Sequence, residues 1–364
     1  MKNSMTICAF GYDFLGGARY WVIATGLKER GFDVIECSTQ KRGFLAKYRD
    51  LCGKYWKLRK QIDVMFVPFP GHYVMPLAWL LGRITGKPIV FDVFVSLYDT
   101  NVEDRKSVPA GSLHARTLSF MDWLSCTLAD VILIDTELQK QYFVERYGIQ
   151  TEKILVLPVG CRTDVFQPQP SREHGADTCT VLFHGTFIPL QGIEIILHAA
   201  AEVQRRDPTV KFHIIGGGQT YEEIRRLAEV LHLENVAFAP YQPMEELAEA
   251  IADADMCLGI FGTSEKAQRV IPHKVYDILC MGKPLITGDT PAARSALLHG
   301  TNAILTKPGD AAALAEAILE LKGDMEMRQK IAESGRKLFQ ETFLPRTITV
   351  PLAAWLDAKR SRKK

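Results

Sequence analysis

Residues 269–289 read RVIPHKVYDILCMGKPLITGD, a pattern that predicts a helix followed by a buried strand. Pro272 suits a helix start, because the amide hydrogen that it lacks would stay unbonded in the first turn anyway. The run HKVYDILCM continues the helix, Gly282 ends it, and the apolar LIT after Pro284 predicts the strand. The free amide groups and the dipole at such a helix start favour the binding of a phosphate.

The charged residues around this helix start suit a nucleotide. Arg269 precedes the helix and Lys274 lies on its first turn, so both add positive charge beside the free amide groups. Asp277 follows Lys274 by three residues and lies on nearly the same helix face. A carboxylate there is suited to accept hydrogen bonds from a ribose diol while the cations hold a diphosphate. The alternative is a surface helix with a chance ion pair.

Short apolar runs alternate with longer amphipathic runs along the chain, which predicts parallel sheets covered by helices on both faces. We expect an α/β fold with two doubly wound, Rossmann-like domains that face one another across a cleft, the usual place of ligands in such sheets. The expected strands are 5–10, 33–38, 63–69, 88–94, 130–135, 153–160, 180–186, 210–216, 236–241, 256–261, 285–287 and 303–306.

A polar, proline-rich segment, 166–178, has the composition of a linker. We therefore expect an N-terminal domain over 1–165 and a C-terminal domain over 178–345. The remaining 346–364 are expected to return to the N-terminal domain as a crossover helix with a basic tail.

Composition narrows the class of protein. A chain of 364 residues with 47% hydrophobic and 24% charged residues is typical of a globular protein of two domains. The net charge of +2 indicates no partner by itself, and nucleic acid is not expected. The eight cysteines form no C-x-x-C pair, so neither a zinc site nor a disulfide framework is indicated. The start lacks a secretory apolar run, and the stretch 73–81 is too short to cross a bilayer, so we expect a cytoplasmic protein.

Several segments resemble retaining glycosyltransferases of family 4, which have the GT-B fold. Most of 180–320 carries the resemblance in the family's order and spacing, and the first half matches more loosely. The matching segments are FHGTFIPLQGIEIILHAA (183–200), KFHIIGGG (211–218), NVAFAPYQPMEELAEAIADADMCL (235–258), IPHKVYDILCMGKPLITGD (271–289) and GGARYWVIATGLKERGFDV (16–34). The resemblance implies transfer of a sugar from a nucleotide diphosphate sugar, without a metal. It also implies that the C-terminal domain holds the nucleotide and the N-terminal domain the acceptor.

The chain departs from the family pattern at its charged positions. The family has two glutamates separated by seven residues, and Arg269 and Asp277 stand in their places. The family's diphosphate-binding pattern G-R-x-x-x-x-K-G reads GTFIPLQG at 185–192, so both cations are absent. A diphosphate still needs positive charge. We therefore expect Arg269 and Lys274 to supply that charge from the other side of the site.

Glycines at strand ends complete the expected donor site, because they let the backbone approach a ligand closely. Each of them also suits an ordinary tight turn. The run Gly216–Gly218 does not complete G-x-G-x-x-G, so the NAD fingerprint is not met. The resemblance places Tyr241 in a loop that flanks the base, although a packing role fits it equally well. The expected donor residues besides the charged ones are Gly16, Gly17, Gly185, Thr186, Gly216, Gly217 and Tyr241.

Polar residues in the first half are candidates for the acceptor. Asp92 falls at the end of an expected strand, where the family often has a His or Asp, and we expect it to help catalysis together with Arg269 and Lys274. His72, Ser96 and Asp99 are candidates for acceptor binding. No dedicated general base is expected, since the leaving diphosphate itself can take the acceptor proton while the site stabilises the separating charge.

The segment 41–60 reads KRGFLAKYRDLCGKYWKLRK, with basic residues interleaved with aromatic ones. It suits an anionic lipid surface, and the alternative is a solvated helix pair over the sheet.

The expected function is therefore transfer of a sugar, most simply from a UDP-sugar, to a glycan or lipid-linked saccharide. A sugar-nucleotide epimerase or hydrolase on the same fold, or a non-catalytic subunit that binds a partner, are the alternatives.

Overall fold

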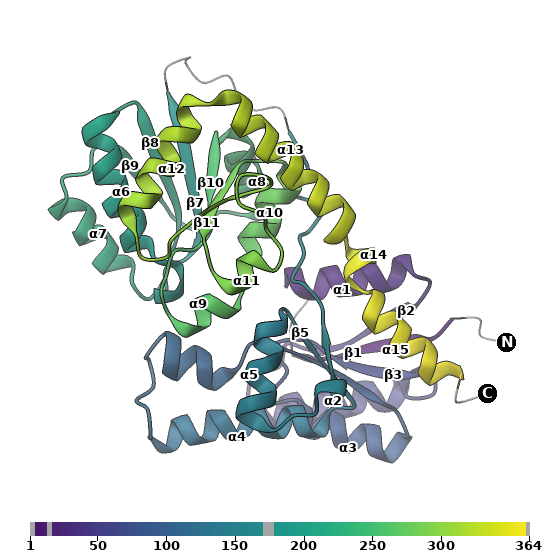
Figure 1. Ribbon diagram of the computed structural model, residues 1–364. Helices are drawn as coiled ribbons and strands as arrows, with labels where there is room; N and C mark the ends of the chain where they lie inside the picture. The colour runs from purple at the N-terminus through teal and green to yellow at the C-terminus, as the bar shows by residue number, and fades with distance from the viewer. Residues whose placement is uncertain (1–3, 13–16, 170–177, 362–364) are drawn as a thin grey trace. The chain divides into compact units, whose positions relative to one another are not determined.

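The computed structural model describes residues 4–12, 17–169 and 178–361. The chain divides into two compact units (Figure 1). The N-terminal unit comprises 1–160 together with 344–364, and the C-terminal unit comprises 161–343. The division falls ahead of the proline-rich segment, at the glycine that follows the last N-terminal strand.

The N-terminal unit contains a parallel sheet of six strands in the order β2-β1-β3-β4-β5-β6. Its central strands are entirely buried, as expected for a sheet that is covered on both faces. The strands are β1 (Thr6–Tyr12), β2 (Asp33–Thr39), β3 (Val64–Val67), β4 (Ile89–Phe94), β5 (Val131–Ile134) and β6 (Ile154–Val156).

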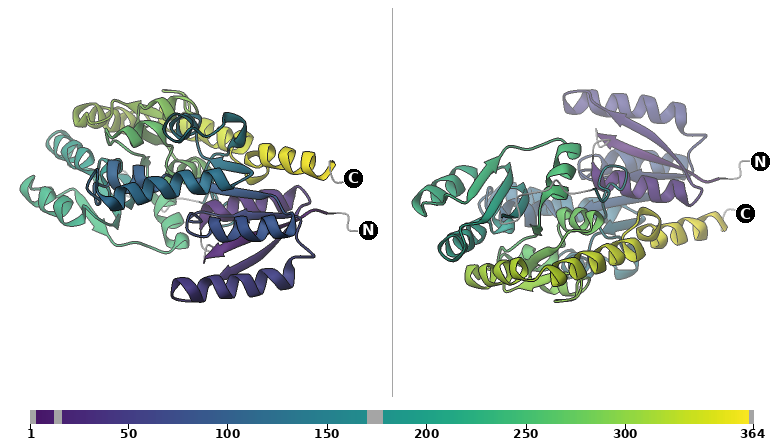
Figure 2. Two further views of the ribbon diagram at one scale, coloured as in Figure 1. Left: turned by 90° about the horizontal axis from the view of Figure 1, so that it is seen from below. Right: turned by 90° about the horizontal axis from the view of Figure 1, so that it is seen from above.

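Helices cover both faces of this sheet (Figure 1). Helix α14 packs on α1, where a Cβ on Gly26 would lie 2.1 Å from the carbonyl oxygen of Pro345, and α15 packs on β6. The basic segment forms one helix, α2, and not a pair; α2 lies at the outer margin of the unit (Figure 2). The elements are α1 (Ala18–Glu29), α2 (Phe44–Leu58), α3 (Met75–Thr85), the π-helix η1 (Asp99–Asp104), α4 (Leu113–Leu128), α5 (Glu137–Tyr147), η2 (Thr151–Lys153), α14 (Pro345–Ile348) and α15 (Val350–Ser361).

The C-terminal unit contains a second parallel six-stranded sheet, in the order β12-β11-β10-β7-β8-β9. The first strand of this unit, β7, lies in the middle, so the strand order reverses between β7 and β10. This is the doubly wound arrangement that the alternating pattern predicts. The strands are β7 (Cys179–Thr186), β8 (Val210–Gly217), β9 (Val236–Ala239), β10 (Met256–Leu258), β11 (Leu285–Gly288) and β12 (Ile304–Thr306).

The helices of the C-terminal unit include one that the sequence pattern did not reveal. Helix α13 packs on α10, and a Cβ on Gly335 would lie 2.8 Å from the Leu279 side chain, so the two helices cross closely there. The helices are η3 (Pro189–Gln191), α6 (Ile193–Arg206), α7 (Tyr221–Val230), α8 (Met244–Asp253), α9 (Glu265–Arg269), α10 (His273–Met281), α11 (Pro291–Arg294), α12 (Ala311–Gly323) and α13 (Met325–Thr342). Among the described residues of both units, no helix has the length and apolar character needed to cross a membrane.

Candidate functional site

The loops that follow β7 and β10 meet where the strand order of the C-terminal sheet reverses. A Cβ on Gly192 would lie 2.5 Å from the backbone nitrogen of Gly262, so the two loops touch through their main chains. The amide of Phe261 donates to the carbonyl oxygen of Gln191 over 3.0 Å. In doubly wound sheets this place is where ligands bind, and here it is formed by residues of a single unit.

Helix α10 follows α9 and carries Lys274 and Asp277, two of the three charged residues that the sequence singled out. It begins at His273 after Pro272 and ends at Met281, with Gly282 in the left-handed conformation at φ 67°, as predicted. Pro272 provides no side-chain cap, so the amide groups of the first turn have no bond from it. Nearly every later residue of α10 is buried, and Pro272 and His273 remain partly accessible.

Lys274 reaches from α10 to the loop after β7. Its Nζ donates to Oε1 of Gln191 over 2.6 Å and lies 3.5 Å from the centre of the Phe183 ring. Burial lowers the pKa of Lys274 well below its usual value, and the nearby Asp277 only partly opposes this. An ammonium group has three hydrogens to donate, and one amide oxygen satisfies only one of them. The site therefore has unused capacity to bind an anion.

The glycines at the ends of β7 and β8 make room for this lysine. Gly185 has φ 147°, and a Cβ on it would lie 3.0 Å from Nζ of Lys274. A Cβ on Gly216, at φ 142°, would lie 2.0 Å from the carbonyl oxygen of Gly185. Both positions therefore require glycine for close packing. Their ligand contacts stay predictions.

Asp277 pairs with a residue that the sequence analysis did not consider. Its Oδ2 lies 3.1 Å from Nδ1 of His273, one helical turn earlier. Its Oδ1 is buried and has no hydrogen-bond partner among the residues that the structure describes. The sequence analysis placed Asp277 beside Lys274, and the two do interact electrostatically. Their direct bonds go elsewhere, because Lys274 extends across to Gln191.

His184 lies at the end of β7, beside these residues. Burial, and then the charge of Lys274, lowers its pKa to about 3, so its ring is neutral. Its Nε2 is buried and has no hydrogen-bond partner within the described chain. A neutral ring beside Lys274 adds no second positive charge next to it.

The other expected donor residues lie around this centre. Arg269 ends α9, which packs on η3, and its side chain is partly exposed. Thr186 is partly exposed at the end of β7. Tyr241 is 59% exposed, and its hydroxyl donates to the carbonyl oxygen of Gly217 over 2.5 Å. The ring is therefore accessible while it lies beside Gly217 at the end of β8, and its contact with a base stays a prediction.

In the N-terminal unit, Asp92 is buried within β4. Both of its carboxylate oxygens accept from Nε of Arg19, at 2.9 and 3.0 Å. Burial raises the pKa of Asp92, and Arg19 only partly offsets this effect. Arg19 also donates to the carbonyl oxygens of Leu157 and Pro158. Asp92 thus ties α1 to the sheet, and its help in catalysis stays a prediction.

His72, Ser96 and Asp99 were expected to be open to an acceptor, and all three are buried instead. Ser96 donates to Oδ2 of Asp122 over 2.7 Å, and Nε2 of His72 lies 3.3 Å from Oδ1 of the same carboxylate. The amide of Asp99 donates to Oγ of Ser96. These residues are buried because Asp122 on α4 provides a buried carboxylate to which the polar side chains after β3 and β4 turn.

Gly17 is the N-cap of α1 and is exposed, with no side-chain cap over the first turn. Gly16, which was expected to act with it, lies outside the described residues. The contact of this glycine pair with a donor stays a prediction.

Sequence reasoning missed four residues that organise these sites. Gln191 stands where the family pattern has lysine, and the partner of Lys274 follows from that substitution once the fold is known. His273 precedes Asp277 by four residues, a spacing that itself indicates an i, i+4 contact. His184 and Asp122 gave no signal, because each lies in an otherwise apolar run.

Comparison with known proteins agrees with this architecture. Residues 168–338 match the model of the family described as Glycosyl transferases group 1. The chain is 25% identical over 245 residues to a GDP-mannose-dependent alpha-(1-6)-phosphatidylinositol monomannoside mannosyltransferase of Mycolicibacterium smegmatis, covering 65% of this chain and 64% of that protein. It is 27% identical over 217 residues to a D-inositol 3-phosphate glycosyltransferase of Nocardia farcinica, covering 56% and 47%. The chain thus spans about half to just under two thirds of the length of these relatives.

Solved structures show the same fold at low sequence identity. Anabaena HepE in complex with UDP has a TM-score of 0.72 at 16% identity, covering 97% of this chain and all of that one. Sucrose-phosphate synthase from Thermosynechococcus elongatus has a TM-score of 0.71 at 16% identity, covering 98% and 100%. Residues 168–338 thus match the model of the glycosyl transferases group 1 family, and the chain has the GT-B fold with two doubly wound α/β domains.

Proposed function

We propose that this chain is a retaining glycosyltransferase that moves a sugar from a nucleotide diphosphate sugar to a glycan or lipid-linked saccharide. The observation that carries the proposal is the bond from Lys274 to Gln191 where the strand order reverses. It brings a buried cation to the position where the family pattern has a lysine and this chain does not. The match of 168–338 to the family model supports the same activity.

In this proposal the diphosphate lies between the first turn of α10 and the end of β7. Lys274 and Arg269 neutralise its charge, and the hydroxyl of Thr186 donates to it. The buried Oδ1 of Asp277 accepts from the ribose, and the exposed ring of Tyr241 lies beside the base. As the glycosidic bond of the donor breaks, negative charge grows on the diphosphate, and the nearby cations stabilise it without a metal.

A UDP-sugar is the first candidate donor. The HepE structures with UDP and with UDP-glucose support it. A relative named as dependent on GDP-mannose supports a guanine nucleotide instead.

A thermal-shift and calorimetric comparison of UDP-, GDP- and ADP-sugars tests the proposal. A ligand that binds only the folded state raises its apparent stability by about 2.7 kcal/mol at a hundred times its dissociation constant. We expect one nucleotide to stabilise the protein and its effect to disappear in Lys274→Gln. If no sugar nucleotide binds, the non-catalytic alternative replaces the enzyme. If the nucleotide is released without any acceptor, the epimerase or hydrolase alternative does.

We further propose that α2 docks on anionic lipid, which suits a lipid-linked acceptor. Phe44 and Leu45 are 57% and 82% exposed at its start. They adjoin a surface groove of about 630 Å³ lined by Lys41, Leu45, Ala46, Arg49, Asp50, Gly53, Lys54 and Lys57. Each basic residue near an anionic bilayer contributes roughly 1 kcal/mol to the free energy of membrane binding, and the exposed apolar side chains can insert among the lipids.

Sedimentation with vesicles tests this surface. We expect binding to phosphatidylglycerol vesicles at low salt, release at high salt, and no binding to phosphatidylcholine. The double variant Arg49→Glu/Lys57→Glu should abolish it. The matched control Lys330→Glu/Lys337→Glu changes two exposed lysines of α13 and should bind as the wild type does. Equal loss in both variants would show that net charge, and not α2, governs the interaction.

A further inference from the structure

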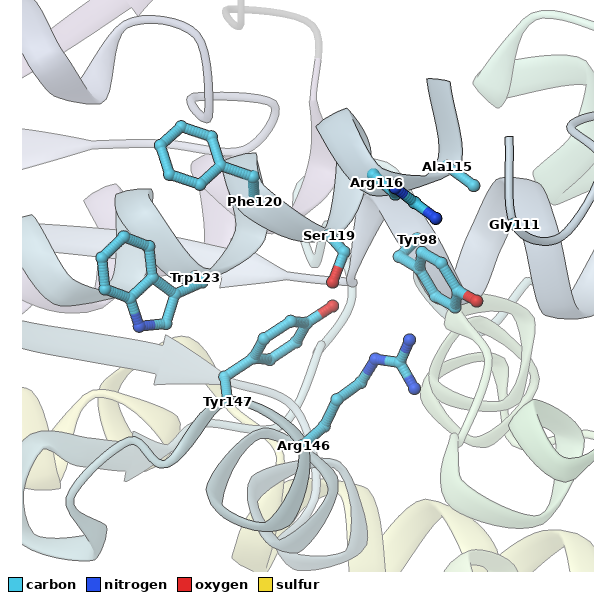
Figure 3. A pocket seen from close by; sticks show the side chains of 9 residues that line it. All are labelled: Tyr98, Gly111, Ala115, Arg116, Ser119, Phe120, Trp123, Arg146 and Tyr147. Carbon is cyan, nitrogen blue, oxygen red and sulfur yellow. The ribbon is translucent and has the colours of Figure 1, made fainter. Parts of the chain in front are cut away.

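The N-terminal unit has a pocket of about 530 Å³ among η1, α4 and α5 that no role described above uses (Figure 3). It combines arginine side chains with accessible aromatic rings. Its lining consists of Tyr98, Gly111, Ala115, Arg116, Ser119, Phe120, Trp123, Arg146 and Tyr147.

The floor of this pocket is held by the buried Asp122. Its carboxylate accepts from the amide of Tyr98 over 3.0 Å and from the hydroxyl of Tyr147 over 3.0 Å. Burial raises the pKa of Asp122, but His72 and the hydrogen bonds outweigh burial, so the pKa lies below its usual value and the group is ionised. Two lining residues are thus fixed by one buried anion. The positions of these two residues therefore do not depend on a bound ligand.

One wall of the pocket carries two arginine side chains, Arg116 and Arg146. Arg146 lies 4.0 Å from the centre of the Tyr98 ring and pairs with Glu103 over 3.4 Å. Arg116 is exposed, and its guanidinium group has no ion pair or hydrogen bond with any residue that the structure describes. Figure 3 shows both guanidinium groups on the side where Tyr98 lies. A guanidinium group without a partner is suited to bind a carboxylate or a phosphate through two parallel hydrogen bonds.

Aromatic rings form the opposite wall. Phe120 and Trp123 are 52% and 42% exposed, with ring centres 5.7 Å apart. They extend along α4 away from the two arginines, past Ser119 and Tyr147, whose hydroxyl groups point toward each other (Figure 3). Exposed aromatic faces pack well against the C–H faces of a sugar ring, and hydroxyl groups beside them bind its hydroxyls.

We propose that this pocket binds a sugar residue bearing a negative charge, a carboxylate or a phosphate, as part of the acceptor. Arg116 and Arg146 contact the charge, and Phe120 and Trp123 pack against the ring. The inference rests on the proposed glycosyl transfer and specifies its acceptor as an acidic saccharide.

Binding is measured directly, by saturation-transfer NMR titration without donor. The probes are methyl β-D-glucuronide, glucose 6-phosphate, methyl β-D-glucoside and inorganic phosphate. We expect one charged sugar to bind about tenfold more tightly than the neutral glucoside, since a charge-assisted hydrogen bond has about that effect. Whichever charged sugar binds identifies the group. Equal affinity for the neutral glucoside, or inorganic phosphate binding as tightly as the phosphosugar, would overturn the proposal.

Two variants locate the binding. Arg116→Ala should remove the preference for charge, and Trp123→Ala should weaken all sugars alike. The matched control is Arg83→Ala, because Arg83 is likewise an exposed arginine on a helix of the N-terminal unit and does not line this pocket. An equal effect of the control would exclude this pocket. Nucleotide binding by the same variants is measured separately, so a failure of the proposed donor site would be recognised on its own.

Discussion

Replacing Lys274 by glutamine removes the charge on which the proposed donor site depends. An amide at this position keeps an N–H donor for Oε1 of Gln191 and adds one amide oxygen of its own. The substitution also removes a cation whose burial has a cost, which its lowered pKa reflects. We therefore expect Lys274→Gln to keep the stability of the ligand-free protein within about 1 kcal/mol of the wild type.

Nucleotide affinity should behave differently. A hydrogen bond to a charged group contributes roughly 1.5–3 kcal/mol, which corresponds to a loss of affinity of about 10- to 150-fold. The double variant Lys274→Gln/Gln191→Lys returns the cation to the loop after β7. Because Nζ of Lys274 and Oε1 of Gln191 are only 2.6 Å apart, the exchanged ammonium group reaches the same space. We expect it to recover at least tenfold of the lost affinity.

Isothermal titration with the nucleotide that stabilises the wild type is the assay, with urea unfolding for stability. The matched control is Lys283→Gln, because Lys283 is also a largely buried lysine with a lowered pKa, bonded to the Ala254 carbonyl at the other end of α10. The control should bind normally. Unchanged affinity in Lys274→Gln, or no recovery in the double variant, would refute the reasoning.

Four further outcomes follow. Asp277→Asn should lower affinity for a ribonucleotide about tenfold and for its 2′,3′-dideoxy analogue much less, since only the former has a diol to donate; titration of both compares them. Because the folded pKa of Lys274 is lowered and a bound diphosphate raises it, nucleotide binding should take up a proton and weaken as pH rises through the folded pKa; calorimetry in buffers of different ionisation enthalpy measures this. The pKa of His184 is about 3 in the folded protein, so its contribution to stability is present above pH 6.5 and is lost as pH falls from 6.5 toward 3. Between neutral pH and pH 5, the wild type should therefore lose about 2 kcal/mol more unfolding free energy than His184→Gln, as measured by urea unfolding. Asp122→Ala should destabilise the N-terminal unit by about 3–5 kcal/mol, because the buried groups that donate to Asp122 lose their acceptor; the control Asp50→Ala on the surface of α2 should leave urea unfolding close to that of the wild type.

The alternating pattern predicted both sheets and the bounds of α10 because local rules decide them. Pro272 and Gly282 set the ends of this helix through the backbone alone, without any contact from the rest of the fold. Helix α13 was missed because its polar composition hides an apolar side. Only Ile331, Gly335 and Phe339 are buried along it, and they pack on elements distant in sequence.

The candidate site was predicted less fully, because partners across loops cannot be read from spacing. Lys274 was identified by its helix position, but its bond to Gln191 joins residues 83 positions apart. The burial of the acceptor candidates could not be read from spacing either. His72 and Ser96 follow strand ends, where side chains often face a ligand, yet Asp122 on α4 provides a buried charge that binds both. The residues that remain exposed there, Arg116 and Trp123, belong to a helix face that carries no strand-end signal.

Placing the cation on α10, and not on the loop after β7, changes how the site is prepared for a ligand. A lysine on an exposed loop is hydrated and free to change rotamer until a ligand binds. The costs of desolvation and of lost side-chain entropy then reduce the binding free energy. Lys274 is already desolvated against Phe183 and held by Gln191 in the folded protein, so ligand binding does not include these two costs. The same burial lowers the pKa of Lys274, because the charged form is unfavourable there until an anion binds beside it. Such a site favours anionic over neutral ligands, because only an anion stabilises the protonated form of Lys274.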